Sequence, residues 1–322
     1  MKKIYLLSLL VVSCMLPALS QVQLTQYFLD GTLYNPSFAG VTDSIFINAI
    51  GRLQWIGLKD ANSHNISPLS VVANFSTPLN GINSGIGLNV IYNEVGFETG
   101  IQGKINYNYG FKFKNKLKRL RIGVAISLMS KSIDYSQLVL ENETDPLLKI
   151  KSKESGLIPD FDLGLLYNHT KKWYVGASGT NLLESSADIG NVTYSQDRTL
   201  YLTAGVYIRL SPKKSKPLYL VPSLLVKSNL ENVQFDFNAR VEYNDLFWAG
   251  LSYRYQDAVA AMAGIEISGF MLGLSYDYTI GSLSGASNGS AEVFLGYRFH
   301  PDQKNKKIRE VKLNSLYNTR YL

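Results

Sequence analysis

The chain has 322 residues and a formal net charge of +7, with 46% hydrophobic, 12% aromatic and 18% charged residues. Its one cysteine, Cys14, lies in an apolar N-terminal stretch, so a mature chain without that stretch has no disulfide, thiol catalyst or cysteine metal site. The 21 Tyr and 26 Gly favour an all-β protein at a boundary between water and an apolar medium.

The N-terminus has the features of a secretory signal. Lys2 and Lys3 precede an apolar run over 4–16, and Ala18-Leu19-Ser20 provides the small residues of a cleavage site. We predict a signal peptide over residues 1–20, whose removal takes the net charge from +7 to +5 because two lysines leave. The alternative is a lipobox that ends in a lipidated Cys14. Mass spectrometry of the mature N-terminus distinguishes the two.

Beyond the signal, the sequence has no apolar run near the roughly 20 residues that a membrane helix needs. A membrane role therefore requires a closed β-barrel, because only helices and barrels satisfy their backbone groups in lipid. Residues 21–43 are irregular and rich in turn formers, and we predict that they form a periplasmic N-terminal segment.

The rest of the chain contains about fourteen segments with strand character, an even number as single-chain bacterial barrels require. Most have about 9–12 residues, the length that crosses a bilayer at a tilt. The predicted strands are 43–54, 66–76, 85–94, 101–113, 120–130, 160–167, 173–180, 199–210, 217–227, 233–243, 247–256, 259–268, 272–280 and 290–299.

Alternation of apolar and polar residues is clearest over 233–243. Phe235 and Phe237 point to one face of this strand, and Asp236 and Arg240 point to the other. In a soluble sandwich the apolar face would point inward, whereas in a barrel in lipid it points outward. Composition alone leaves both arrangements open.

The lengths of the connections favour the barrel. Counted from the first strand, the odd connections include the four longest, 55–65, 131–159, 181–198 and 281–289, and the even ones are mostly short. Bacterial barrels have long loops outside and short turns on the periplasmic side. We therefore predict an all-β, transmembrane antiparallel β-barrel over residues 44–300 in the bacterial outer membrane.

Basic residues gather at the short turns and in the polar C-terminal tail, residues 301–322, which we place in the periplasm. One interpretation is a cationic rim that meets anionic lipid or an acidic partner, and the other is that lysines solubilise turns. The tail either docks on a periplasmic partner or is disordered. The turn residues are Lys114, Lys116, Lys118, Arg119, Lys171, Lys172, Lys213, Lys214 and Lys216.

Short motifs along the mature chain match one family in order and spacing. They include Gln26-Tyr27-Phe28, Asn35-Pro36-Ser37-Phe38-Ala39-Gly40, Arg52-Leu53-Gln54-Trp55-Ile56-Gly57, Trp248-Ala249-Gly250, Tyr253-Arg254 and Tyr276-Asp277-Tyr278-Thr279. With these motifs the chain resembles the PorP/SprF family, outer-membrane proteins of the type IX secretion system in Bacteroidetes. Ser37, Glu94 and Ala291 depart from the usual pattern, so we expect a divergent member.

The resemblance implies a non-enzymatic barrel that helps to secrete, retain or anchor surface proteins such as gliding adhesins. Its expected partners are periplasmic and outer-membrane components of the secretion machinery, an exported adhesin or its C-terminal domain, and outer-membrane lipid, with no nucleic acid. The alternative function is a porin-like or hydrophobic-solute channel. A barrel lipase is a third, for which the sequence offers no nucleophile constellation.

Two groups of residues are candidates for a functional role. The family-motif positions are Asn35, Pro36, Gly40, Arg52, Gln54 and Trp55. The polar strand faces predict a lumen network of Asp236, Arg240, Trp248, Arg254, Asp277 and Glu292. These charges either line a wet path for solutes or pair in salt bridges that fill the lumen, and near balance of acids and bases favours pairing.

We expect no catalytic, metal or cofactor site. His64, His169 and His300 are far apart in the sequence, and no His/Asp/Glu spacing is typical of a metal site. Gly85-x-Gly87 falls on a predicted strand and is better interpreted as a packing feature than as a phosphate-binding loop.

Overall fold

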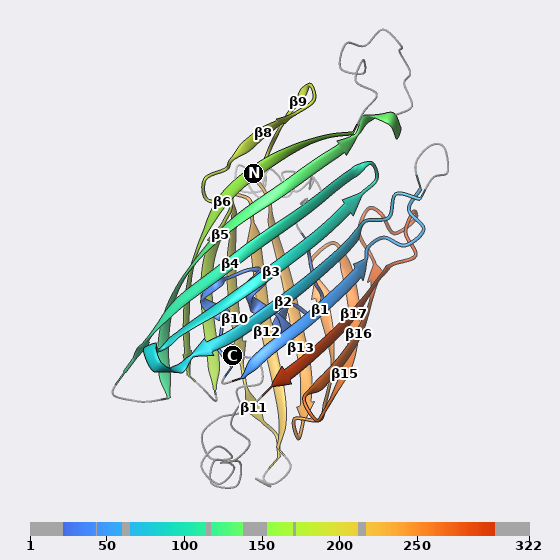
Figure 1. Ribbon diagram of the computed structural model, residues 1–322. Helices are drawn as coiled ribbons and strands as arrows, with labels where there is room; N and C mark the ends of the chain where they lie inside the picture. The colour runs from blue at the N-terminus through green and yellow to red at the C-terminus, as the bar shows by residue number, and fades with distance from the viewer. Residues whose placement is uncertain are drawn as a thin grey trace, which may run out of the picture.

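The computed structural model describes residues 22–42, 44–59, 65–113, 117–137, 153–169, 172–211 and 217–299. They form a closed antiparallel barrel of fourteen strands (Figure 1), because β10 and β11 are two parts of one interrupted strand in a sheet of 15 segments. The predicted fold is therefore confirmed. The strands are β1 (Ile45–Leu53), β2 (Leu69–Leu79), β3 (Ser84–Val95), β4 (Glu98–Lys112), β5 (Lys118–Asp134), β6 (Lys153–His169), β7 (Trp173–Thr180), β10 (Thr199–Val206), β11 (Ile208–Arg209), β12 (Leu218–Ser228), β13 (Val233–Tyr243), β14 (Phe247–Arg254), β15 (Ala258–Ile267), β16 (Phe270–Thr279) and β17 (Ser290–Phe299).

Each strand pairs with its neighbours in the sequence, and the ring closes where β1 pairs with β17. Every barrel strand of the described chain has a partner on both sides, since β10 also bridges β7 and β12. A closed ring satisfies the backbone donors and acceptors that a sheet edge would expose.

The two faces of the wall differ in polarity as the alternation predicts. On β13, Phe235 and Phe237 are exposed on the outer surface, whereas Asp236, Asn238 and Arg240 are buried inside. The same pattern holds around the ring, where large exposed apolar side chains cover the outside. The apolar face of the sheet therefore points outward.

One end of the barrel extends beyond the predicted strands. β5 and β6 have 17 residues each, and the predicted loop over 181–198 contains a hairpin of β8 (Ser186–Ile189) and β9 (Val192–Ser195). The Tyr135 hydroxyl donates to the Ile189 carbonyl at 2.7 Å, which ties the hairpin to the end of β5. This end, at the top of Figure 1, is the long-loop mouth, and the opposite end is the short-turn mouth.

The N-terminal segment lies inside the barrel, where Figure 1 shows it in blue. It contains three short 3-10 helices, η1 (Tyr27–Leu29), η2 (Gly31–Leu33) and η3 (Pro36–Phe38). We expected residues 21–43 in the periplasm, but the apolar side chains of this segment pack against Trp248, Phe294 and other lumen residues. Burial of these side chains explains the difference. We call residues 22–42 the lumen segment.

Several sequence predictions lie outside the described residues. They are the signal peptide with Cys14, the C-terminal tail, and most of the turn lysines. No helix among the described residues is long and apolar enough to cross a membrane.

Candidate functional site: a filled lumen and a cavity at its mouth

Five buried charged side chains meet at one side of the lumen. Arg52 Nη2 lies 2.8 Å from Asp277 Oδ2, and its Nη1 lies 3.4 Å from Glu292 Oε2. Arg254 bridges Asp277 at 3.3 Å and Asp236 at 3.4 Å. The structure thus places five of the sequence-predicted residues, Arg52 of the family motif among them, in one charge cluster. Pairing compensates the large cost of removing these charges from water.

The other two predicted lumen residues lie on β13 and β14. Arg240 pairs with Glu242 at 2.7 Å, and its guanidinium lies 4.0 Å from the centre of the Phe28 ring in the lumen segment. Trp248 is buried, and a Cβ on Gly264 would come within 2.1 Å of its indole ring. Both side chains therefore pack inside the barrel.

Thr25, through which the lumen segment joins the charge cluster, was not among the residues predicted from the sequence. The Thr25 hydroxyl donates to Asp277 at 2.7 Å and accepts from Arg52 Nη1 at 3.1 Å. The backbone N–H groups of Thr25 and Gln26 donate to Glu292 at 2.9 and 3.0 Å. Residues 21–43 show no periodicity, and the family match at Gln26 was the one signal in the sequence that marked this position.

Asn35 fixes the second half of the lumen segment against the wall. Its Oδ1 accepts from Ser37 N at 2.9 Å and caps η3, whose first residue is Pro36, which suits a helix start. Its Nδ2 donates to the carbonyls of Leu165 at 3.0 Å and Ala177 at 3.3 Å. One side chain thus forms the local turn and binds two neighbouring strands.

Two glycines allow the lumen segment to approach the wall closely. Gly40 has a φ of +60°, and a Cβ there would lie 2.4 Å from the Thr77 carbonyl oxygen. A Cβ on Gly164 would lie 2.1 Å from Asn35 Oδ1. A larger residue at either position would push the segment away.

Gln54 and Trp55 lie at the long-loop mouth and do not join the charge cluster. The Gln54 N–H donates to the Pro68 carbonyl at 2.8 Å, and the Trp55 N–H donates to Ser290 Oγ at 3.0 Å. Trp55 has a left-handed φ of 48°, so this motif shapes the loop that leaves β1.

A second buried ion pair holds the middle of the lumen segment. Lys104 Nζ lies 2.8 Å from Asp162 Oδ2 and donates to the Leu33 carbonyl at 3.0 Å. Nearby, Asp30 accepts from the N–H and hydroxyl of Thr32, and burial raises the pKa of Asp30 to about 6.

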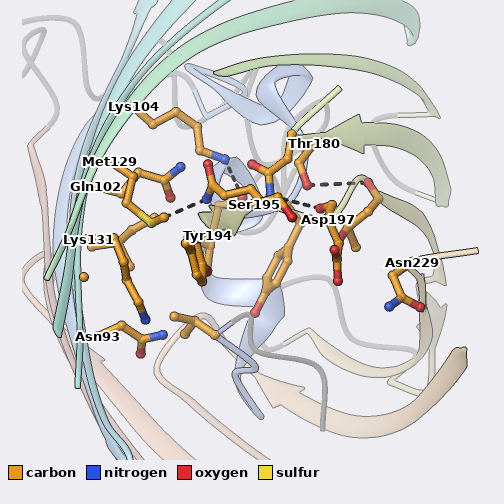
Figure 2. A pocket seen from close by; sticks show the side chains of 18 of the residues that line it. Asn93, Gln102, Lys104, Met129, Lys131, Thr180, Tyr194, Ser195, Asp197 and Asn229 are labelled. Carbon is orange, nitrogen blue, oxygen red and sulfur yellow. Dashed lines mark hydrogen bonds between the residues drawn. The ribbon is translucent and has the colours of Figure 1, made fainter. Parts of the chain in front are cut away.

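A cavity of about 280 Å³ opens above the lumen segment at the long-loop mouth (Figure 2). Leu33 and Tyr34 of the lumen segment line it, and so do Tyr194 of the β8–β9 hairpin and Gln196, which follows the hairpin. Five carboxamide side chains line the cavity: Asn93, Gln102, Asn181, Gln196 and Asn229.

The two lysines of the cavity already have acidic partners. Lys104 binds Asp162, and Lys131 Nζ lies 2.6 Å from Glu98 and 5.0 Å from the centre of the Tyr194 ring. The cavity is therefore suited to a ligand that is rich in hydrogen-bonding groups, because a carboxamide both donates and accepts.

In the part of the chain that the structure describes, no three His, Cys, Asp or Glu side chains are placed to hold a metal ion. The charged groups of the lumen contact one another and the lumen segment.

Among solved structures, the chain is similar to the Acinetobacter baumannii outer membrane protein Omp33, with a TM-score of 0.45 and 6% identity over 81% of this chain and 100% of that chain. It is similar to a Pseudomonas aeruginosa FadL homologue, with a TM-score of 0.43 and 11% identity over 88% and 96% of the two chains. The translocator domain of the autotransporter NalP from Neisseria meningitidis gives a TM-score of 0.37 and 14% identity over 80% and 89%. No curated protein sequence matches the chain.

The sequence model of the type IX secretion system membrane protein PorP/SprF matches residues 17–297. This range includes the lumen segment and almost all of the barrel, so the match covers the parts that carry the motifs. The chain is a closed β-barrel that belongs to the PorP/SprF family of type IX secretion system membrane proteins.

Proposed function

We propose that this protein is a non-enzymatic docking component of type IX secretion. It helps to secrete, retain or anchor surface proteins such as gliding adhesins, through contacts with other secretion components. In the same proposal residues 1–20 direct export, and the basic tail lies in the periplasm.

The filled lumen is the observation that carries the proposal. Residues Leu24 to Ala39 lie inside the ring and are almost all buried, and Thr25 engages the carboxylates of Asp277 and Glu292. A barrel whose interior is packed with its own chain is suited to present surfaces to partners. Carboxylates that already accept hydrogen bonds from the lumen segment fit a structural role better than a role in acid–base catalysis.

The cavity at the long-loop mouth supports a polypeptide as the partner. Carboxamides such as Gln102 and Asn229 can bind the N–H and C=O groups of an extended main chain. β9 lies beside the cavity and pairs with β8 alone among the described strands, so its other edge can accept a further strand.

The porin-like alternative has less support. Solute flow needs an open lumen, and here Arg52, Lys104 and Arg240 contact both the wall charges and the lumen segment. We expect the intact protein to give no steady single-channel current in planar bilayers. Robust currents from the intact protein without partners would favour the channel.

Site-specific photo-crosslinking in cells tests the docking role. A photoreactive residue replaces Gln102 in the cavity, and a matched one replaces Ile126, which lies on the outer surface of the neighbouring strand. We expect an exported surface protein or a secretion component to crosslink at position 102 and not at position 126. Equal crosslinking at both positions, or none at position 102 while export proceeds, would contradict the proposal.

A further inference from the structure

A small cavity of about 60 Å³ lies at the short-turn mouth, between the exit of the lumen segment at Gly40 and the β4–β5 hairpin. Its three charged lining residues are Lys112, Arg119 and Arg121, and none of the lining residues is acidic. A water molecule occupies roughly 10–15 Å³ of such space, so the cavity has room for a small polyatomic group.

The local sequence around these cations is basic. Between Glu98 and Asp134 the chain has eight basic residues, including these three, and no acidic residue. By contrast, the basic residues Lys131 and Lys104 of the same hairpin reach Glu98 and Asp162 toward the other mouth.

The register of the hairpin brings the cations together. Lys112 lies directly opposite Arg119, and like charges in this arrangement destabilise a sheet. Gly110 lies opposite Arg121, and its missing side chain leaves space in front of the guanidinium group. An anion in this space would relieve the repulsion between Lys112 and Arg119.

Donors for an anion remain available around the cavity. Arg119 Nε is buried and has no hydrogen-bond partner among the described residues. Arg121 Nη1 donates to the side-chain oxygen of Asn168 at 3.0 Å, which holds this guanidinium group at the cavity wall. The side chains of Asn80 and Asn83 also line the space.

We propose that this cavity is an oxyanion site that binds a phosphate group. Two guanidinium groups and one ammonium match the several oxygens and the double charge of a phosphate, whereas one carboxylate would neutralise one charge. The site is independent of the docking role proposed above, because it lies at the opposite mouth of the barrel.

Isothermal titration of the purified full-length protein in neutral detergent tests the site with inorganic phosphate as the probe. We expect saturable binding, and a loss of affinity of at least about tenfold in Arg119→Gln and in Lys112→Gln, because each removes a charge-assisted contact. Arg119→Gln leaves every described hydrogen bond between side chains intact. Retention of heat-modifiable migration in gels verifies that both variants fold.

Lys131→Gln is the matched control, since it removes the same charge from the same hairpin at the other mouth. It should change the affinity by less than about twofold. Equal losses of phosphate affinity in all three variants would indicate a general electrostatic effect of the basic hairpin and would contradict the site. The absence of phosphate binding, or an unchanged affinity in Arg119→Gln, would also contradict it.

A second experiment distinguishes a lipid headgroup from a soluble phosphate as the natural ligand. The protein is reconstituted in phosphatidylcholine discs with or without phosphatidylglycerol, and phosphate is titrated again. A lower apparent affinity for phosphate in the discs that contain phosphatidylglycerol would identify a lipid headgroup as the source. Undiminished phosphate binding in those discs would identify a soluble phosphate.

Discussion

Glu292, the third residue of the last strand, accepts hydrogen bonds from two consecutive backbone N–H groups that begin with Thr25. The two residues are 267 positions apart in the chain. This contact joins the N-terminal segment to the seam where β1 and β17 close the barrel, because Arg52 and Glu292 are register partners across that seam. Docking of the segment and closure of the ring therefore use the same carboxylate.

Replacing Glu292 with Ala should strongly destabilise the barrel. The change leaves two buried N–H groups without an acceptor and removes one of the two acidic partners of Arg52. Breaking one side of a buried ion pair typically costs about 3–5 kcal/mol. The midpoint of urea unfolding in detergent measures the loss.

The control for this experiment is Glu184→Ala. Glu184 pairs with Arg198 at 3.0 Å on the exposed long-loop side, and such exposed pairs contribute at most about 1 kcal/mol. Similar midpoints for the two variants would show that the Glu292 contact adds little to stability.

Replacing Gly164 with Ala should displace the lumen segment. The new Cβ would lie 2.1 Å from Asn35 Oδ1, and overpacking of this kind costs roughly 1–3 kcal/mol. We expect faster thermolysin cleavage within residues 22–42 of the refolded protein. Gly103→Ala, on the same barrel with no atom within 4 Å of its Cβ position, should be cleaved like the unchanged chain. Equal cleavage of the two variants would argue against this contact.

The stability of the protein should depend on the protonation of Asp30. Its pKa is raised from 3.8 to about 6 by burial, so the folded chain binds a proton more tightly than the unfolded one. The contribution of Asp30 therefore favours folding at low pH and declines as pH rises from about 4 to about 6, by at most roughly 3 kcal/mol.

The Asp30→Asn variant should lose this dependence and be more stable than the unchanged chain above pH 6. Thermal unfolding midpoints at a series of pH values measure the difference between the two proteins. Asp197→Asn, which removes an exposed carboxylate at the long-loop mouth, is the control variant. A constant difference between Asp30→Asn and the unchanged chain across the range would refute the prediction.

A charge on the outer surface should be tolerated at the turns and harmful in the middle of the wall. Ile126 is the central residue of β5 and is 69% exposed, and Ile82 in the turn between β2 and β3 is 56% exposed. Arginine at the bilayer midplane of a barrel costs about 2–4 kcal/mol and about 0–1 near the interface. Folding into liposomes should therefore be impaired in Ile126→Arg and nearly normal in Ile82→Arg. Equal folding would place the membrane elsewhere on the barrel.

The strands and their two faces could be predicted from the sequence because the alternation of side chains along a strand is a local property. Phe237 and Asp236 point in opposite directions whatever the rest of the fold does. The same local rule assigned Asp236, Arg254 and Asp277 to one face of the sheet. The extra length of β5 and β6 was not predicted, since their outer ends carry weaker alternation.

The tertiary structure alone decided what fills the barrel and where its cations gather. Residues 22–42 have no period, and their position depends on contacts such as Thr25 with Glu292, which form only when the ring closes. The grouping of Lys112, Arg119 and Arg121 around Gly110 likewise depends on the register of two strands. Local sequence determines which way a side chain points, but its partners are determined by which strands come together.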